Sequence, residues 1–229
     1  VHSVGGWAAL VAVWLLGARI GKFKNGNPQA IPGHSIPMAT AGVLILWLGW
    51  FGFNGGSVLS ADPELTSLTL VTTCLAAAAG GVVAAFVSFL KYKNLDLTMF
   101  LHGILVGLVG ITAGPDLMTP ESAIIIGAIA GALIVFAVAF IDAIKLDDPV
   151  GAIAVHLICG IWGTLAVGIF STNPEHTFLT QLTGVVCYAI FCLVTSFLII
   201  FTLKKTVGIR VSEREELEGL DAHEHGMDA

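Results

Sequence analysis

The chain has 229 residues, of which 56% are hydrophobic and only 11% charged, and its mean hydropathy is +0.91. An ordinary soluble domain carries about 25% charged residues, so this composition excludes a soluble globular protein and indicates an integral membrane protein. The formal net charge of −6 owes much to residues 212–229, and we expect neither a nucleic-acid partner nor a cofactor.

Stretches without Asp, Glu, Lys or Arg follow one another along the chain. Each approaches or exceeds the roughly 20 residues that a helix needs to cross about 30 Å of hydrocarbon. The first has neither a basic leader nor a cleavage site of small residues, so it is not typical of a signal peptide, and we interpret the chain as N-terminally incomplete. The seven stretches are 3–18, 36–61, 65–90, 97–115, 122–141, 149–174 and 177–203.

The basic residues gather on one side of these stretches. Lys and Arg follow the first, third, fifth and seventh, as at Arg19, Lys91, Lys145 and Lys204, whereas the opposite loops hold acids and no base. Because cytoplasmic loops collect Lys and Arg, we predict a multi-pass protein of the cell (inner) membrane with a cytoplasmic C-terminus. We divide it into a transmembrane region, 1–205, and a tail, 206–229, whose charge is typical of disorder or dependence on a partner.

A short motif occurs in the first stretch and again in the sixth, which run in opposite directions. Each copy has Val before His, a β-branched residue two places after it and Gly four places after it, around His2 and His156. A motif repeated on antiparallel spans is typical of an inverted-topology repeat with its pathway between the halves. A single intramembrane histidine is as often structural, but the duplication favours two neutral rings that line a pathway.

Aromatic residues cluster toward the outer end of the second stretch. Trp47 and Phe51 are ordinary for a membrane interface, where aromatic belts are common. Phe53 and Ser57 are four residues apart and share a helix face, so they offer an aromatic surface and a hydroxyl acceptor to a small cation. His102 we interpret as structural.

Three further patterns predict structure and no chemistry. Asp147-Asp148-Pro149 is a helix-start signal. Small residues four apart, Gly103/Gly107 and Gly127/Gly131, predict close helix packing. The four cysteines lie in apolar runs without a Cys-x-x-Cys pair, which favours packed thiols. Two tail histidines, His223 and His225, are only a weak metal signal, and we expect no metal site.

Taken together, these motifs resemble those of the Amt/Mep/Rh ammonium transporter superfamily, most closely its bacterial Amt members, and the match runs from Val1 to the end of the chain. Residues 50–57 resemble the family's aromatic motif on its sixth helix. Residues 147–156, with Cys159 and Gly160, resemble its tenth helix, and 219–221 with 225–226 resemble its cytoplasmic tail.

The resemblance implies an all-α integral membrane fold of eleven helices built as an inverted repeat, of which this chain keeps the end of the fifth helix and all of the sixth to eleventh. It implies a homotrimer with one pore per subunit. His2 and His156 match the twin pore histidines, Phe53 matches a gate residue, Trp50 lines the pore below that gate, and Ser57 matches the hydroxyl of the outer ammonium site. The tail is similar to one that meets a PII-type regulatory protein.

The predicted function is therefore transport of ammonium, which is recruited at the outer site, deprotonated, and passed through an apolar pore as ammonia. A channel for neutral solutes such as water, urea or gas remains an alternative, although Phe53 and Ser57 argue against it. An ammonium sensor that signals through the tail is another. An enzyme is not expected, because no nucleophile, base and orienting acid occur together.

Overall fold

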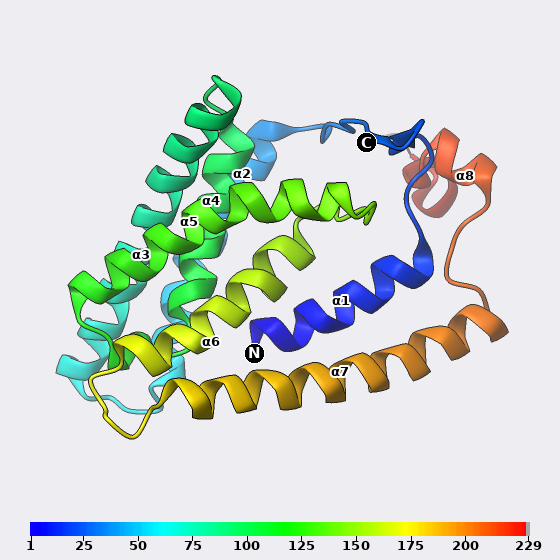
Figure 1. Ribbon diagram of the computed structural model, residues 1–229. Coiled ribbons are helices and arrows are strands. Elements are labelled where there is room, and N and C mark those ends of the chain that lie inside the picture. Colours follow the sequence, from blue (N-terminus) through cyan, green and yellow to red (C-terminus); the bar gives the residue numbers. More distant parts are fainter. Residues whose placement is uncertain (228–229) are drawn as a thin grey trace.

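The computed structural model describes residues 1–227, and almost all of its regular structure is helical (Figure 1). Each of the seven predicted stretches coincides with a helical segment. Within residues 1–227, five segments are long and apolar enough to span a membrane, and α1 and α4 are shorter apolar helices. The long elements are α1 (His2–Leu16), α2 (Ile36–Ser57), α3 (Pro63–Tyr92), α4 (Leu97–Ile111), α5 (Pro120–Ala143), η2 (Ala152–Ile158) continued by α6 (Cys159–Phe170), and α7 (Phe178–Thr206).

The short elements lie in the connections and in the tail. A two-stranded antiparallel hairpin, β1 (Phe23–Lys24) and β2 (Asn27–Pro28), follows α1. A 3₁₀ turn, η1 (Pro115–Leu117), precedes α5, and the tail holds α8 (Glu213–Glu218) and a π-helical turn, η3 (Asp221–His225).

Side-chain caps fix where the helices begin. The carboxylate of Asp62 accepts a hydrogen bond from the Leu65 N–H at the start of α3, and the Thr119 hydroxyl accepts from Ser122 N–H at the start of α5. A proline at the first helical position follows both caps, where its missing N–H costs nothing. Capping side chains of the same kind start α2, α4 and α7, at Ser35, Asp96 and Thr177.

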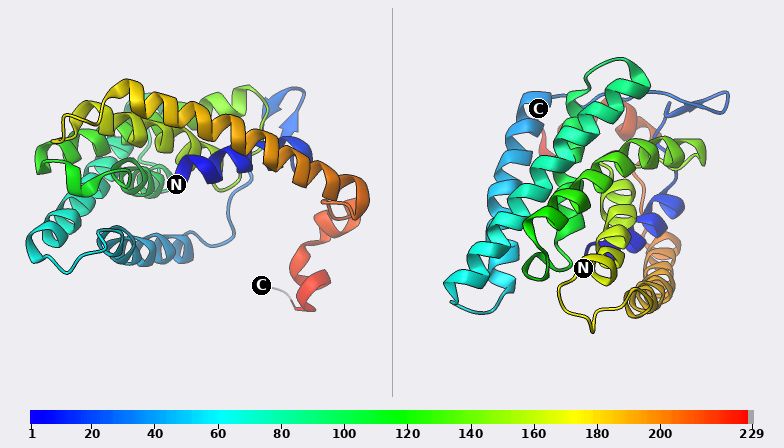
Figure 2. Two further views of the ribbon diagram at one scale, coloured as in Figure 1. Left: turned by 90° about the horizontal axis from the view of Figure 1, so that it is seen from below. Right: turned by 60° about the vertical axis from the view of Figure 1, so that its left-hand side comes forward.

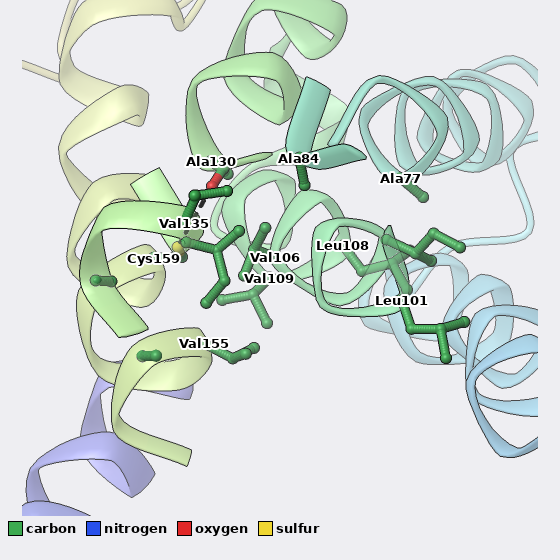
Figure 3. Packing of buried hydrophobic residues seen from close by; sticks show 14 of the residues in the cluster. Ala77, Ala84, Leu101, Val106, Leu108, Val109, Ala130, Val135, Val155 and Cys159 are labelled. Carbon is green, nitrogen blue, oxygen red and sulfur yellow. Dashed lines mark hydrogen bonds between the residues drawn. The ribbon is translucent and has the colours of Figure 1, made fainter. Parts of the chain in front are cut away.

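The core of the molecule lies where α3 passes between α4 and α5 (Figure 1). A Cβ atom added to Gly107 of α4 would lie 2.8 Å from the carbonyl carbon of Ala76, and one added to Gly127 of α5 would lie 2.7 Å from the same atom. Gly103 and Gly131 meet Gly80, one turn further along α3, just as closely. The predicted packing role of these small residues is confirmed, and Figure 3 shows the apolar side chains that fill the space around this crossing.

A second group of helices, α1, η2–α6 and α7, lies beside this core, with α1 between the other two (Figure 1). Figure 2 shows α7 and α2 on opposite sides of the bundle. Most large side chains of α2, including Leu44, Ile45 and Leu48, are exposed, as expected of a surface that faces lipid or another subunit.

The composition of the tail predicted disorder or dependence on a partner; in the structure the tail forms α8 and folds back against the loop that follows α1. The Glu216 carboxylate accepts a hydrogen bond from the Ile20 N–H at 2.7 Å and pairs with Arg210 at 2.8 Å. Arg210 also donates to the carbonyl of Leu16, and a capping box between Ser212 and Glu215 starts the helix. Side chains far away in sequence thus supply the partners that the tail composition alone does not reveal.

The prediction of packed thiols is right for half of the cysteines. Cys159 and Cys192 are buried, whereas Cys74 and Cys187 lie exposed on α3 and α7, and all four are free. An apolar run does not distinguish a buried position from one that faces lipid, since both environments favour the same residues.

Candidate functional site

The two histidines of the repeated motif meet where the start of α1 lies against η2. Their Nδ1 atoms are 3.3 Å apart, and the rings stack with centroids 5.3 Å apart and planes inclined by 27°. His2 begins α1 and His156 lies in the π-helical segment η2, so the contact joins positions 154 residues apart in the chain.

The glycine of each motif allows this contact. A Cβ atom added to Gly6 would lie 2.6 Å from Cβ of Leu157, the residue that follows His156. A Cβ atom added to Gly160 would lie 2.8 Å from the nitrogen of Ser3, the residue that follows His2. The two motifs therefore pack antiparallel, main chain against main chain, as an inverted repeat predicts.

The aromatic residues of α2 cover the ring of His2. Trp50 stacks on it with centroids 5.2 Å apart, and Phe53 lies 6.0 Å away, tilted by 48°. Trp50 and Phe53 contact each other edge to face at 5.7 Å. The indole N–H of Trp50 donates to the hydroxyl of Thr112 at 2.8 Å, which ties this ring to the end of α4.

Ser57 lies one turn beyond Phe53 and lines a cavity of about 180 Å³, together with Asn54, Thr112 and Asp116. We call this space the outer cavity. The Ser57 hydroxyl donates to the carbonyl of Phe53 at 2.6 Å, so its own lone pairs are left to accept hydrogen bonds.

The predicted site residues thus form one continuous arrangement. From Ser57 it leads past Phe53 and Trp50 to His2 and then to His156. In the described part of the chain, Nε2 of His2 is buried without a hydrogen-bond partner. If one Nδ1 donates to the other, each ring still has a nitrogen with which to meet a small polar guest.

Sequence reasoning missed what holds the far end of this arrangement. Asp148 does cap the sixth span, but from a distance: its Oδ2 accepts from the N–H groups of Ile153 and Ala154, and the helix starts at Ala152 instead of Pro149. Asp147 has a separate role, because it binds the side chain and the backbone N–H of Arg19 at 2.8–2.9 Å.

The Asp147 carboxylate is almost completely buried, and its charge is balanced by Arg19. Burial favours the neutral acid, but hydrogen bonds and the positive charge of Arg19 outweigh it and hold the pKa of Asp147 below its ordinary value. This pair joins the loop after α1 to the loop before η2, and so connects the two segments that carry the histidines. The sequence gives no local sign of this ion pair, because Arg19 and Asp147 are 128 positions apart in the chain.

Fold and site together define a multi-pass helical membrane protein in which two histidines from distant segments contact each other. The chain matches the family model described as the Ammonium Transporter Family over residues 1–229. It is 42% identical over 244 residues to the ammonium transporter Amt2 of Archaeoglobus fulgidus, an alignment that covers 98% of this chain and 52% of that protein. The chain therefore belongs to the ammonium transporter family, whose members are transporters and not enzymes.

Solved structures agree with this assignment. A structure titled Sensor Amt Protein superposes with a TM-score of 0.94 at 39% identity, covering 98% of this chain and 58% of that one. Mep2 of Candida albicans superposes with a TM-score of 0.85 at 26% identity, covering 94% and 51%. The chain spans about half the length of the curated relatives it matches.

Proposed function

We propose that the full-length protein conducts ammonium as ammonia, along the arrangement that begins at Ser57 and ends between His2 and His156. Ammonium is recruited in the outer cavity by the Ser57 hydroxyl and the aromatic face of Phe53. It loses its proton near Phe53, and ammonia passes the two imidazoles. The single observation that carries this proposal is the contact of the two ring nitrogens at 3.3 Å, beneath the Trp50 and Phe53 rings.

The loss of the proton follows from the cost of desolvation. Moving an ion of this size from water into a medium of low dielectric constant costs on the order of 20 kcal/mol by Born estimates. The apolar stretches of the sequence hold no acid to offset this cost, and aromatic rings cannot replace a full hydration shell. Neutral ammonia avoids most of the penalty, because it needs only the donor and acceptor that a pair of uncharged imidazoles offers.

The decisive experiment measures uptake of methylammonium by the full-length protein in liposomes, with and without a membrane potential. Replacing both His2 and His156 by Ala should abolish uptake, whereas His34→Ala, in an exposed loop, should leave it unchanged. Uptake that survives loss of both imidazoles would refute the proposal. Equal conduction of water or urea, without preference for methylammonium, would instead favour a channel for neutral solutes.

The finer features of topology and assembly belong to the same proposal. We take residues 1–205 as the transmembrane region and 206–229 as a cytoplasmic tail that a PII-type protein could recognise, which the lysines and arginines on this side support. The homotrimer that the family resemblance implies is compatible with the exposed apolar surface of α2, which suits another subunit as well as lipid. The mass of the full-length protein in detergent tests the homotrimer, and the change in mass when a purified PII-type protein is added tests its binding.

A further inference from the structure

The outer cavity is lined by residues from two helices and a short turn. Ser57 and Asn54 come from α2, and Thr112 directly follows the last residue of α4. Pro115 and Asp116 belong to η1. The proposed function uses only Ser57 of this set, so the other polar side chains of the cavity need an explanation of their own.

The two hydroxyl groups of the outer cavity are left as hydrogen-bond acceptors. The Ser57 hydroxyl donates to the carbonyl of Phe53 at 2.6 Å, and the Thr112 hydroxyl donates to the carbonyl of Leu108 at 2.7 Å. A hydroxyl has a single proton to donate and two lone pairs with which to accept. Thr112 uses one lone pair for the indole N–H of Trp50 and keeps the other. Each hydroxyl oxygen can therefore bind a further group only by accepting from it.

The side-chain amide of Asn54 is oriented by a similar chain of hydrogen bonds. The Thr73 hydroxyl donates to the carbonyl of Thr69 at 2.6 Å, so it can only accept from Asn54, whose nitrogen lies 2.9 Å away. This contact fixes which end of the amide is the nitrogen. The oxygen Oδ1 of Asn54 is thereby left to accept, and one N–H of the amide is left to donate.

Asp116 adds a negative charge to these acceptors. It is half-buried, and none of the ion pairs found among residues 1–227 involves its carboxylate. The turn that carries it is held on both sides. The carbonyl of Pro115 accepts from the Thr72 hydroxyl at 2.7 Å. The carbonyl of Leu117 accepts from the Thr172 N–H at 2.9 Å. The backbone of Asp116 is therefore fixed at the cavity, where the charge of its side chain is not balanced by a neighbouring base of this part of the chain.

The loops that we predict on the same side of the membrane carry charge of the same sign. They contain no Lys or Arg, and besides Asp116 they hold the acids Asp62, Glu64, Glu121 and Glu175. A cleft surrounded by charge of one sign raises the local concentration of ions of the opposite sign and speeds their arrival. This face of the protein therefore attracts cations, and Asp116 is the acid among these five that lines the outer cavity.

We infer that Asp116, with the side-chain oxygens of Asn54 and Thr112, forms a second cation position in the outer cavity, in addition to the one at Ser57 and Phe53, and that this position selects small cations with N–H groups. The inference rests on the proposed function, because it takes ammonium as the ion that enters. Ammonium has four N–H donors and no acceptor, which matches a set of acceptors that includes a negative charge. Water and urea also carry acceptors, and for these the lining offers a single side-chain N–H, that of Asn54. A potassium ion has no N–H to donate and is held in proteins by rings of carbonyl oxygens.

The test measures methylammonium uptake into liposomes and, separately, ammonium binding by calorimetry, both with the full-length protein. Asp116→Asn keeps the size of the side chain and an acceptor oxygen but removes the charge, and Asp116→Glu keeps the charge. Glu175→Gln is the matched control, because it removes the same charge from an exposed position in another loop that we predict on this side. In the calorimetry, potassium chloride is the control for ammonium chloride.

Asp116→Asn should raise the half-saturating concentration of methylammonium by about tenfold at an unchanged maximal rate, and should weaken ammonium binding by the same factor, which corresponds to about 1.4 kcal/mol. Asp116→Glu and Glu175→Gln should both match the unmodified protein. If Asp116→Asn matches it too, if Glu175→Gln has an equal effect, or if potassium binds as tightly as ammonium, the second position is refuted while the proposed function stands. If ammonium binding depends on Asp116 but the unmodified protein carries no methylammonium, the proposed function fails and the second position stands.

Discussion

The crossing of α3 with α4 and α5 leads to a sharp prediction for Gly127→Ala. The new Cβ would overlap the carbonyl oxygen of Ala76 and lie 2.7 Å from its carbonyl carbon, so the helices must separate by more than about 0.7 Å before the contacts become ordinary ones. Helix α3 is also held in place by α4, because Gly107 of α4 approaches the same carbonyl group of Ala76 just as closely. Overpacking of this kind typically costs about 1–3 kcal/mol, and we expect the upper end of that range.

The measurement is the free energy of unfolding of the full-length protein in mixed micelles titrated with SDS. Gly49→Ala is the control, because no other atom lies within 4 Å of the added Cβ and the site is an exposed position of α2. The control should be as stable as the unmodified protein or slightly more stable, since alanine is the better helix former. If Gly127→Ala were as stable as Gly49→Ala, the close packing of α3 between α4 and α5 would be refuted.

Three other predictions use the same assay or proteolysis. Thr112→Val leaves the Trp50 indole N–H without its acceptor and should lower the unfolding free energy by about 1–3 kcal/mol, whereas Thr112→Ser should not. Arg19→Met should cost about 2 kcal/mol at pH 7, less than the roughly 3–5 kcal/mol of a fully buried pair, because the Arg19 side chain is 38% exposed. The pKa of Asp147 is lowered in the folded protein. The difference in unfolding free energy between the unmodified protein and Arg19→Met should therefore be complete above about pH 4 and shrink as the pH falls through the pKa of folded Asp147. A difference that does not change with pH would contradict the pairing. Glu216→Gln weakens the contacts of the tail with Ile20 and Arg210 and should speed proteolysis of the tail without changing unfolding of the helices, and equal digestion rates would speak against the docked tail.

The sequence was sufficient to predict the helical segments, because an uncharged run of about 20 residues has few other structures open to it in lipid. The meeting of His2 and His156 could also be anticipated, since the same motif appears on two antiparallel spans. Phe53 and Trp50 contact the ring of His2, and Ser57 lines the outer cavity; the roles of these three residues in transport remain predictions.

Other features could not be predicted, because they depend on residues far apart in the chain. Nothing local distinguishes Asp147, which binds Arg19, from Asp148, which caps η2. His102 has neighbours that the sequence does not indicate either, because they come from the loops after α1 and α5; its interpretation as structural stays a prediction. The π-helical form of η2 carries no compositional signal, and the tail appeared disordered because its partners lie beside α1.

The reciprocal contacts of Gly6 with Leu157 and of Gly160 with Ser3 make the spacing of the two imidazoles a property of the backbone. A transporter that works by rocking one half against the other would have to break and re-form these backbone contacts in every cycle. A channel with a fixed backbone need not, and its rate can approach that of substrate diffusion. We therefore expect the backbone around the two imidazoles to stay in place during transport, and any gating to be confined to side chains at the pore entrances, Phe53 first among them.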